Sequence, residues 1–150
     1  MGVRSLDHVG VVVDDLEAAI AFFVDLGFER EEAGTVEGEW VDKVVGLDGV
    51  RAEVVFVRTP DGNGKLELIK YHSPSDDDGA HPSAANRLGI RHVSFVVDDL
   101  DTVIDGLRSK GLNTVGEVQD YEETFRLCYV RGPEGIIVEL AEQIGSNATA

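Results

Sequence analysis

The sequence predicts an α+β fold in which one domain is built from two similar βαβββ modules. The first observation is an internal repeat, because residues 8–28 and 92–112 align without a gap and share a His-Val start, a Val-Val-Asp-Asp-Leu run, an Ile and a Gly. The second observation is a later echo, in which Val-Arg-Thr-Pro-Asp-Gly at 57–62 corresponds to Val-Arg-Gly-Pro-Glu-Gly at 130–135. Two echoes in the same order indicate a duplicated module rather than chance.

Each module begins with a β-branched run, at His8 and again at His92, which predicts a buried strand. Two aspartates follow each run and offer an N-cap for a helix with an apolar stripe at helical spacing. Gly27 and Gly111 are typical of the residue that ends such a helix. Three strands complete each module, and we expect them at 35–41, 51–58 and 65–71 in the first and at 114–118, 125–131 and 136–141 in the second.

The predicted single domain spans residues 1–150, a length that suits one domain. It divides into module 1 at about 5–71, a linker at 72–90, module 2 at about 91–142 and a tail at 143–150. The linker is polar and contains proline, and a short helix is expected in it around residues 84–88.

The composition restricts the partners and the compartment. The 13 Lys and Arg residues face 29 Asp and Glu residues, and the net charge of −16 argues against nucleic acid and anionic membranes as partners. No apolar stretch is long enough for a membrane helix, and the first residues lack the apolar core of a signal peptide. The single cysteine, Cys128, cannot form an intrachain disulfide, so we expect a cytoplasmic protein.

Four polar residues in apolar strands are the candidate site. Strand alternation places His8 and His92 opposite the helix-packing residues, and it places Glu67 and Glu139 on the same non-helical face of their strands. A carboxylate in an apolar strand is costly to desolvate unless something pairs with it. Two imidazoles and two carboxylates around one divalent cation would satisfy all four and leave positions for water or substrate. A lone strand His or Glu is more often structural, but the recurrence of both types in both modules favours a metal site.

These residues make the chain resemble the vicinal oxygen chelate superfamily, which includes glyoxalase I, methylmalonyl-CoA epimerase, extradiol dioxygenases, and fosfomycin and bleomycin resistance proteins. The resemblance covers about residues 5–142 and is carried by the His-initiated strands before Asp-Asp-Leu, the Pro-Asp-Gly and Pro-Glu-Gly turns, Leu-Glu-Leu and Val-Glu-Leu. It implies sheets that curl into a cup with one divalent metal ion (Zn, Ni, Co, Mn or Fe) at the base. The implied metal ligands are His8, Glu67, His92 and Glu139.

The resemblance also implies a reaction, that of a glyoxalase-like lyase or isomerase acting on a small substrate with vicinal oxygens through an enediolate or enolate. By analogy Glu139 is the base, and Glu67 is a spectator ligand or a second proton carrier. The His/Glu/His/Glu pattern matches bacterial glyoxalase I, whereas the epimerases usually have glutamine at the position of Glu67. Ile136 and Phe23 depart from the glyoxalase pattern, and residues 82–92 resemble the epimerases, so the substrate stays open between a glutathione hemithioacetal, an acyl-CoA and others.

Two other functions compete with this one. An extradiol-type dioxygenase would use iron(II) and two His with one carboxylate, which leaves one of the four residues idle. A non-catalytic binding or resistance protein would bind a ligand without turnover, although bleomycin-binding members generally lack the ligands. We expect a homodimer, because two four-stranded sheets leave edge strands to be covered, and the metal can lie within one chain or between two.

Two further sets of residues are candidates for contact with the substrate. Aromatic residues in strands are more often core than site, but three of them could line the cup: Trp40, Phe56 and Tyr129. Three arginines could meet an anionic group, and nothing in the sequence singles one out: Arg91, Arg126 and Arg131.

Overall fold

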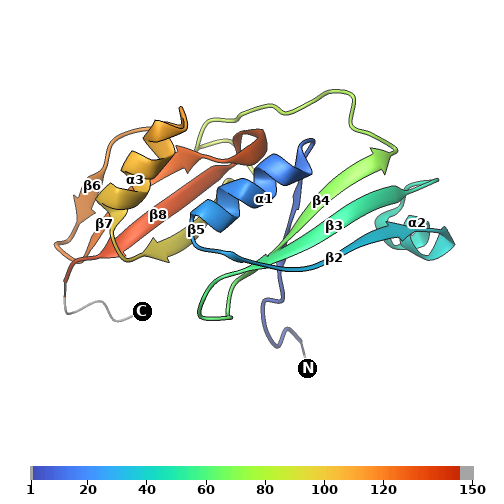
Figure 1. Ribbon diagram of the computed structural model, residues 1–150, viewed down its shortest axis with the longest axis horizontal. Helices are drawn as coiled ribbons and strands as arrows, with labels where there is room; N and C mark the ends of the chain where they lie inside the picture. The colour runs from blue at the N-terminus through green and yellow to red at the C-terminus, as the bar shows by residue number, and fades with distance from the viewer. Residues whose placement is uncertain (1, 146–150) are drawn as a thin grey trace. The chain divides into compact units, whose positions relative to one another are not determined.

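The computed structural model describes residues 2–145, and the chain divides into two compact units, Met1–Gly79 and Ala80–Ala150. The boundary falls inside the predicted linker. Each unit holds one four-stranded mixed sheet with a ten-residue helix packed on it (Figure 1). The predicted class, α+β with tandem βαβββ modules, is therefore confirmed. That the two units form a single domain stays a prediction.

Unit 1 follows the predicted module with one added helix. Its elements are β1 (Val9–Val12), α1 (Leu16–Asp25), β2 (Glu29–Glu37), α2 (Glu39–Val45), β3 (Arg51–Arg58) and β4 (Lys65–Ser73). The strand order is β1-β4-β3-β2, with β1 parallel to β4 and the other neighbours antiparallel. The parallel pair places β1 beside β4, the last strand of the unit, and so brings His8, which precedes β1, near Glu67 on β4.

The first helix forms where the sequence predicts it. Asp15 is its N-cap, and the carboxylate accepts a hydrogen bond from Ala18 N at 3.0 Å. Gly27, at φ +110°, follows the helix in a backbone conformation that side chains disfavour. One face of α1 is buried, with Phe23 fully enclosed, and this face packs on β3 and β4.

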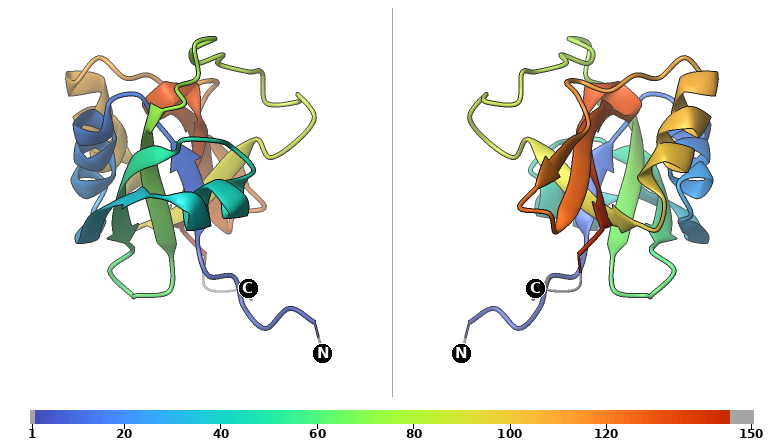
Figure 2. Two further views of the ribbon diagram at one scale, coloured as in Figure 1. Left: turned by 90° about the vertical axis from the view of Figure 1, so that its right-hand side faces the viewer. Right: turned by 90° about the vertical axis from the view of Figure 1, so that its left-hand side faces the viewer.

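Unit 2 repeats the plan. Its elements are β5 (His92–Val97), α3 (Leu100–Ser109), β6 (Gln119–Tyr121), β7 (Phe125–Arg131), a short 3-10 turn (Pro133–Gly135) and β8 (Ile137–Gln143), in the sheet order β5-β8-β7-β6. Figure 2 shows α3 (light orange) beside the strands of its own sheet (darker orange and red). Asp99 caps α3 by accepting from Thr102 N at 3.1 Å, and Gly111 follows the helix at φ +80°.

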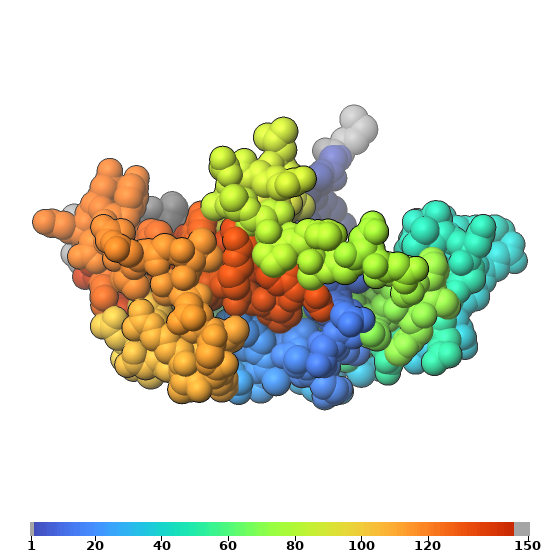
Figure 3. Space-filling model, turned by 90° about the horizontal axis from the view of Figure 1, so that it is seen from above, coloured from blue at the N-terminus to red at the C-terminus, as the bar shows by residue number. Residues whose placement is uncertain are grey.

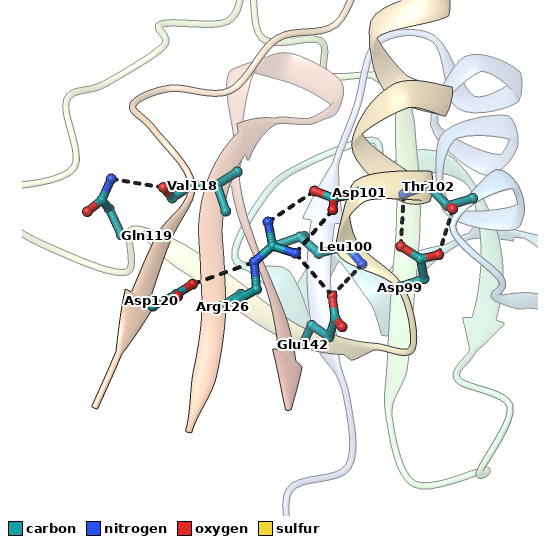
Figure 4. A network of polar contacts seen from close by, with 9 residues as sticks. All are labelled: Asp99, Leu100, Asp101, Thr102, Val118, Gln119, Asp120, Arg126 and Glu142. Carbon is teal, nitrogen blue, oxygen red and sulfur yellow. Dashed lines mark hydrogen bonds and ion pairs between the residues drawn. The ribbon is translucent and has the colours of Figure 1, made fainter. Parts of the chain in front are cut away.

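An arginine ties α3 to its sheet (Figure 4). Arg126 on β7 donates to both oxygens of Asp101 at 3.1 Å and lies 3.5 Å from Asp120 and 4.0 Å from Glu142. Glu142 on β8 in turn accepts from Leu100 N, the first amide of α3, at 2.9 Å. These contacts use the N-terminal end of the helix, where carboxylates are favoured, and they fix α3 across three strands.

Two predicted strands are wrong in their boundaries. In unit 1 the strand expected at 35–41 runs from Glu29 to Glu37, and α2 follows it. The change of structure occurs at Gly38, whose φ is +108°, and α2 ends at Gly46 in the left-handed conformation. The first half of β2 is an exposed, charged edge strand, so it lacks the alternation by which strands are recognised.

In unit 2 the strand expected at 114–118 lies later, at Gln119–Tyr121. In the expected segment, Thr114 forms an isolated bridge to Val130, and Val115 N donates to Tyr129 O at 2.7 Å. The strand is short because Glu122 and Glu123 follow it with φ of +48° and +55°, which turns the chain back into β7.

The linker lies on the surface. All residues from 72 to 90 are exposed except Ser83, which is half-buried, and Figure 3 draws this segment in yellow-green. The prediction of a short helix at 84–88 is wrong. The segment forms a turn, in which Arg87 N donates a hydrogen bond to Ala84 O at 3.1 Å. No helix of residues 2–145 is long and apolar enough to cross a membrane.

Candidate functional site: two histidine–glutamate pairs

The first pair lies on the face of the unit 1 sheet opposite α1. His8 immediately precedes β1, and its Nε2 lies 3.4 Å from Oε2 of Glu67 on β4. The parallel register sets Gly10 opposite Glu67, so β1 contributes no side chain beside the carboxylate. The two side chains are partly exposed, His8 by 36% and Glu67 by 23%.

Further side chains surround His8. Asp7 Oδ2 lies 2.6 Å from Nδ1 of His8, and this hydrogen bond is the largest cause that holds the pKa of Asp7 below its usual value. Phe56 on β3 meets the imidazole ring edge to face, with the ring centroids 5.7 Å apart, and Lys65 lies over Phe56. Both ring nitrogens of His8 therefore face carboxylates, Nδ1 toward Asp7 and Nε2 toward Glu67.

The second pair lies at the corresponding place in unit 2. His92 Nε2 is 3.4 Å from Oε2 of Glu139 on β8, with exposures of 40% and 21%. Ser94 stands opposite Glu139 in the register, and its hydroxyl donates to Oε1 of that carboxylate at 3.2 Å. The Tyr129 hydroxyl lies 3.4 Å from His92 Nδ1, and the two rings are 5.1 Å apart.

The predicted alternation holds in both units. Leu68 and Leu140, each next in sequence to a glutamate, are fully buried on the helix side. On the other face, beside the pairs, Val12 is 53% exposed and Val96 is 72% exposed. Each unit thus presents one imidazole and one carboxylate on an open sheet face that also carries apolar residues.

The donor atoms of each pair are spaced as metal ligands would be. A separation of 3.4 Å is longer than a hydrogen bond of about 2.7–3.2 Å. Two donors bound to one tetrahedral cation at about 2.1 Å each would lie about 3.4 Å apart. Imidazole nitrogen and carboxylate oxygen are also the donor types that zinc and related divalent ions accept. Each pair therefore fits half of a four-ligand set.

The meeting of all four ligands stays a prediction. Among residues 2–145, no three or more His, Cys, Asp or Glu side chains form a group that could hold a metal ion. The structure brings His8 to Glu67 and His92 to Glu139, and each unit alone supplies two ligands.

The other candidates separate into residues near the pairs and residues that stabilise the fold. Phe56 and Tyr129 contact the two histidines, whereas Trp40 lies on α2 and is 60% exposed. Arg126 is engaged in the network at α3, and Arg131 donates to Gly135 O at 2.9 Å within a turn.

The buried Nε of Arg91 has no hydrogen-bond partner among residues 2–145. Cys128 is buried, and desolvation raises the pKa of its thiol. A high pKa makes the thiol a poor nucleophile, so Cys128 is not part of the candidate site.

One helix modifies the open face in unit 1 only. Val41 of α2 packs in a cluster with Ala52, Ile69 and Tyr71. Ile69 and Tyr71 share the face of β4 that carries Glu67, so α2 covers the far end of this face. The structure describes no helix in the corresponding part of unit 2, residues 112–118.

Sequence reasoning missed two residues of the site, Asp7 and Ser94. Asp7 is adjacent to a candidate ligand in sequence, and this adjacency was the available signal. Ser94 needs the register between β5 and β8, which only the structure gives.

Comparison with known proteins places these features in a family. The family model described as Glyoxalase/Bleomycin resistance protein/Dioxygenase superfamily matches residues 5–140. The chain is 28% identical to mouse methylmalonyl-CoA epimerase over 91% of this chain and 72% of the relative, and 24% identical to the uncharacterized protein YaeR of Escherichia coli over 95% and 99%. A solved glyoxalase family protein of Bacillus cereus shares 39% identity at a TM-score of 0.92, with 97% of each chain covered. The fosfomycin resistance protein FosX of Listeria monocytogenes, at 15% identity and a TM-score of 0.61 over 97% of each chain, shares the fold.

Proposed function

The chain belongs to the glyoxalase/bleomycin resistance protein/dioxygenase superfamily, and from its two His–Glu pairs we propose that it is a metal-dependent lyase or isomerase of small substrates with vicinal oxygens. The observation that carries the proposal is the recurrence of the same pair, at the same 3.4 Å, on the open face of both units. Ligand binding alone requires no such repeated set of donors.

The proposed ligands of one divalent ion (Zn, Ni, Co, Mn or Fe) are His8, Glu67, His92 and Glu139. Their support is the donor chemistry and spacing of each pair. A Glu-to-Gln mutant of FosX, a protein of the same fold, has been solved with Mn(II) and 1S,2S-dihydroxypropylphosphonic acid. When bound, the cation would supply Lewis acidity toward two neighbouring substrate oxygens and stabilise negative charge that develops on them.

The carboxylates of the chain would carry the proton. Glu139 takes a proton from the substrate carbon next to a carbonyl, and the electron pair of that C–H bond moves toward the carbonyl oxygen to give an enolate or enediolate. Ser94 donates to Oε1 of Glu139 at 3.2 Å and so holds the carboxylate in one orientation. Glu139 then returns the proton to the same carbon or to its neighbour; alternatively, a protonated Glu67 supplies its own proton to the carbon, and Glu139 releases the first proton to solvent. No electrons are gained or lost, so this step needs no redox partner.

The substrate class follows from the need for an acidic C–H bond beside a carbonyl. The epimerases among the relatives favour an acyl thioester, and the four-ligand pattern favours an α-hydroxy-carbonyl compound such as a hemithioacetal. Both classes lose the same proton in the proposed step. A non-catalytic binding protein is the alternative, and it predicts ligand binding without exchange of that proton.

The test is hydrogen exchange in D2O. Metal-loaded protein should introduce deuterium beside the carbonyl of an acyl-CoA or an α-hydroxy-carbonyl substrate. Glu139→Gln should slow the exchange by about 10²–10⁴-fold, while metal content is measured in parallel to separate loss of the base from loss of the ion. Glu37→Gln, at the exposed end of β2, is the matched control and should exchange normally. Full turnover with bound metal in Glu139→Gln would remove Glu139 from the role of base.

We also propose that the protein is a homodimer. Each sheet ends in two edge strands, β1 and β2 in unit 1 and β5 and β6 in unit 2, and open edges favour association. Light scattering should give twice the mass of the 16.2 kDa chain; a mass of one chain at micromolar concentration would contradict the proposal.

A further inference from the structure

The two histidines differ in what their second ring nitrogen meets. Nδ1 of His8 lies 2.6 Å from the Asp7 carboxylate, whereas Nδ1 of His92 lies 3.4 Å from the Tyr129 hydroxyl. In the repeat, the residue that corresponds to Asp7 is Arg91, since both precede the histidine directly. The duplicated module therefore keeps the ligand pair but has a carboxylate behind only one histidine.

This difference decides which ring nitrogen carries the proton. Both carboxylates can only accept, but the Asp7 contact, at 2.6 Å, is within hydrogen-bond length, and the Glu67 contact, at 3.4 Å, is longer than a hydrogen bond. A neutral His8 therefore holds its proton at Nδ1 and donates it to Asp7. Nε2 of His8 is then left with its lone pair, directed toward Glu67 at 3.4 Å. A phenol hydroxyl both donates and accepts, so Tyr129 imposes no tautomer on His92.

The ring of His8 also has three neighbouring side chains. Phe56 meets it edge to face, nearly perpendicular at 88°, while Asp7 and Glu67 contact opposite ring nitrogens. A carboxylate behind a metal-binding imidazole raises the basicity of the ligand and fixes its direction. The ring of His8 is therefore preorganised, with the lone pair of Nε2 already directed toward the proposed metal position in the metal-free protein.

On the premise of the proposed metal function, we infer that Asp7 is a positioning residue that makes His8–Glu67 the tight half of the ligand set and leaves His92–Glu139 as the exchangeable half. This division suits the proposed roles of the two carboxylates. Glu67 stays with the tightly held half, and Glu139, in the weaker half, is free to take the substrate proton.

The first test needs no metal. Long-range ¹H–¹⁵N NMR of the metal-free protein, at a pH about 1.5 units above the usual imidazole pKa of about 6.5, reports the tautomer of each of the four histidines. His8 should be protonated mainly at Nδ1, and Asp7→Asn should abolish that preference while leaving His92 unchanged. A His8 protonated mainly at Nε2 in the wild-type protein would overturn the inference. Because the Asp7 side chain is 81% exposed, we expect the variant to fold.

The second test is Zn²⁺ affinity by competition with a chromogenic chelator. Asp7→Asn should weaken binding by about 10–100-fold, and Asp7→Glu, which keeps the charge, should recover part of the loss. Tyr129→Phe should change the affinity by less than about 3-fold, since its contact with His92 is long. Asp48→Asn removes the same charge from an exposed loop of unit 1 and should leave the affinity unchanged. An equal loss in Tyr129→Phe and Asp7→Asn would contradict the unequal halves.

The two tests separate this inference from the proposed function. If the wild-type protein binds no divalent ion, the proposed function fails, and the unequal halves fail with it, whatever tautomer NMR reports for His8. If the wild-type protein binds the ion and Asp7→Asn alters neither the tautomer nor the affinity, the inference alone fails.

Discussion

Gly135 and Gly62 offer a matched pair of substitutions that tests how the linker is held. They occupy the same place in the two Pro-acid-Gly turns and have similar left-handed φ values, +74° and +79°. A side chain in that conformation costs about 1–2 kcal/mol. Gly62→Ala should therefore destabilise the protein by about that amount, because a Cβ there meets nothing within 4 Å.

At Gly135 the same substitution meets the linker. A Cβ would lie 2.7 Å from Cγ, 2.9 Å from Cβ and 3.2 Å from Cα of Pro82, contacts that force the linker or the turn to move. Overpacking of this kind adds about 1–3 kcal/mol. Gly135→Ala should thus cost about 2–5 kcal/mol in total, more than its counterpart in unit 1.

Urea denaturation followed by far-UV circular dichroism measures both free energies of unfolding. In the background Pro82→Gly, which removes the Cβ and Cγ atoms of the ring, the extra cost of Gly135→Ala should largely disappear. Equal destabilisation by Gly135→Ala and Gly62→Ala would show that Pro82 does not lie against the turn in solution, and the reasoning would be refuted.

Three further predictions concern stability and reactivity. Arg126→Met removes the cation shared by three carboxylates and should lower the midpoint of thermal unfolding (Figure 4). The difference from the wild type should shrink in high salt, because salt screens the repulsion among the three carboxylates. An unchanged midpoint at low salt would contradict the network. Asp99 accepts hydrogen bonds from Thr102, and these lower the pKa of Asp99 in the folded protein, the bond from the backbone amide having the largest effect. The cap therefore stabilises the protein fully at pH values above the unfolded pKa of about 4. This stabilisation is lost as the pH falls through the lower folded pKa. Asp99→Ala should therefore be less stable than the wild type at pH 7, and the difference should shrink as the pH falls through the folded pKa of Asp99, as thermal melts over a series of pH values would show. The Cys128 thiol, whose pKa is raised by burial, should resist Ellman's reagent at pH 8 until the protein unfolds, and rapid labelling of the native protein would contradict its burial.

The repeat made much of the fold predictable. The Asp-Asp-Leu runs, with Gly27 and Gly111, located both ten-residue helices, because capping and helix termination depend on local residues. The segments between each helix and the next strand were not predictable in the same way. Residues 29–45 carry charges on an edge strand and then a short helix, and their conformation depends on Gly38 and on the packing of Val41 against the sheet.

The site was predictable at the level of strand faces. Alternation correctly placed His8 and Glu67 on one face because the period of a strand is fixed. The contacts around them depend on side-chain direction and register, which no periodicity encodes. The Asp7–His8 and Ser94–Glu139 hydrogen bonds are of this kind, and they distinguish two halves that share the same His and Glu positions in the repeat.

Metal binding to single-ligand variants tests the central claim most directly. Equilibrium dialysis of the wild-type protein against Zn²⁺, Ni²⁺, Co²⁺ and Mn²⁺ should find one tightly bound ion per chain. His8→Ala and His92→Ala should each weaken the binding strongly, because each variant removes one of the two ligands that its unit supplies. A wild-type protein that holds no ion, or a His92→Ala variant that binds as tightly as the wild type, would contradict the shared four-ligand centre.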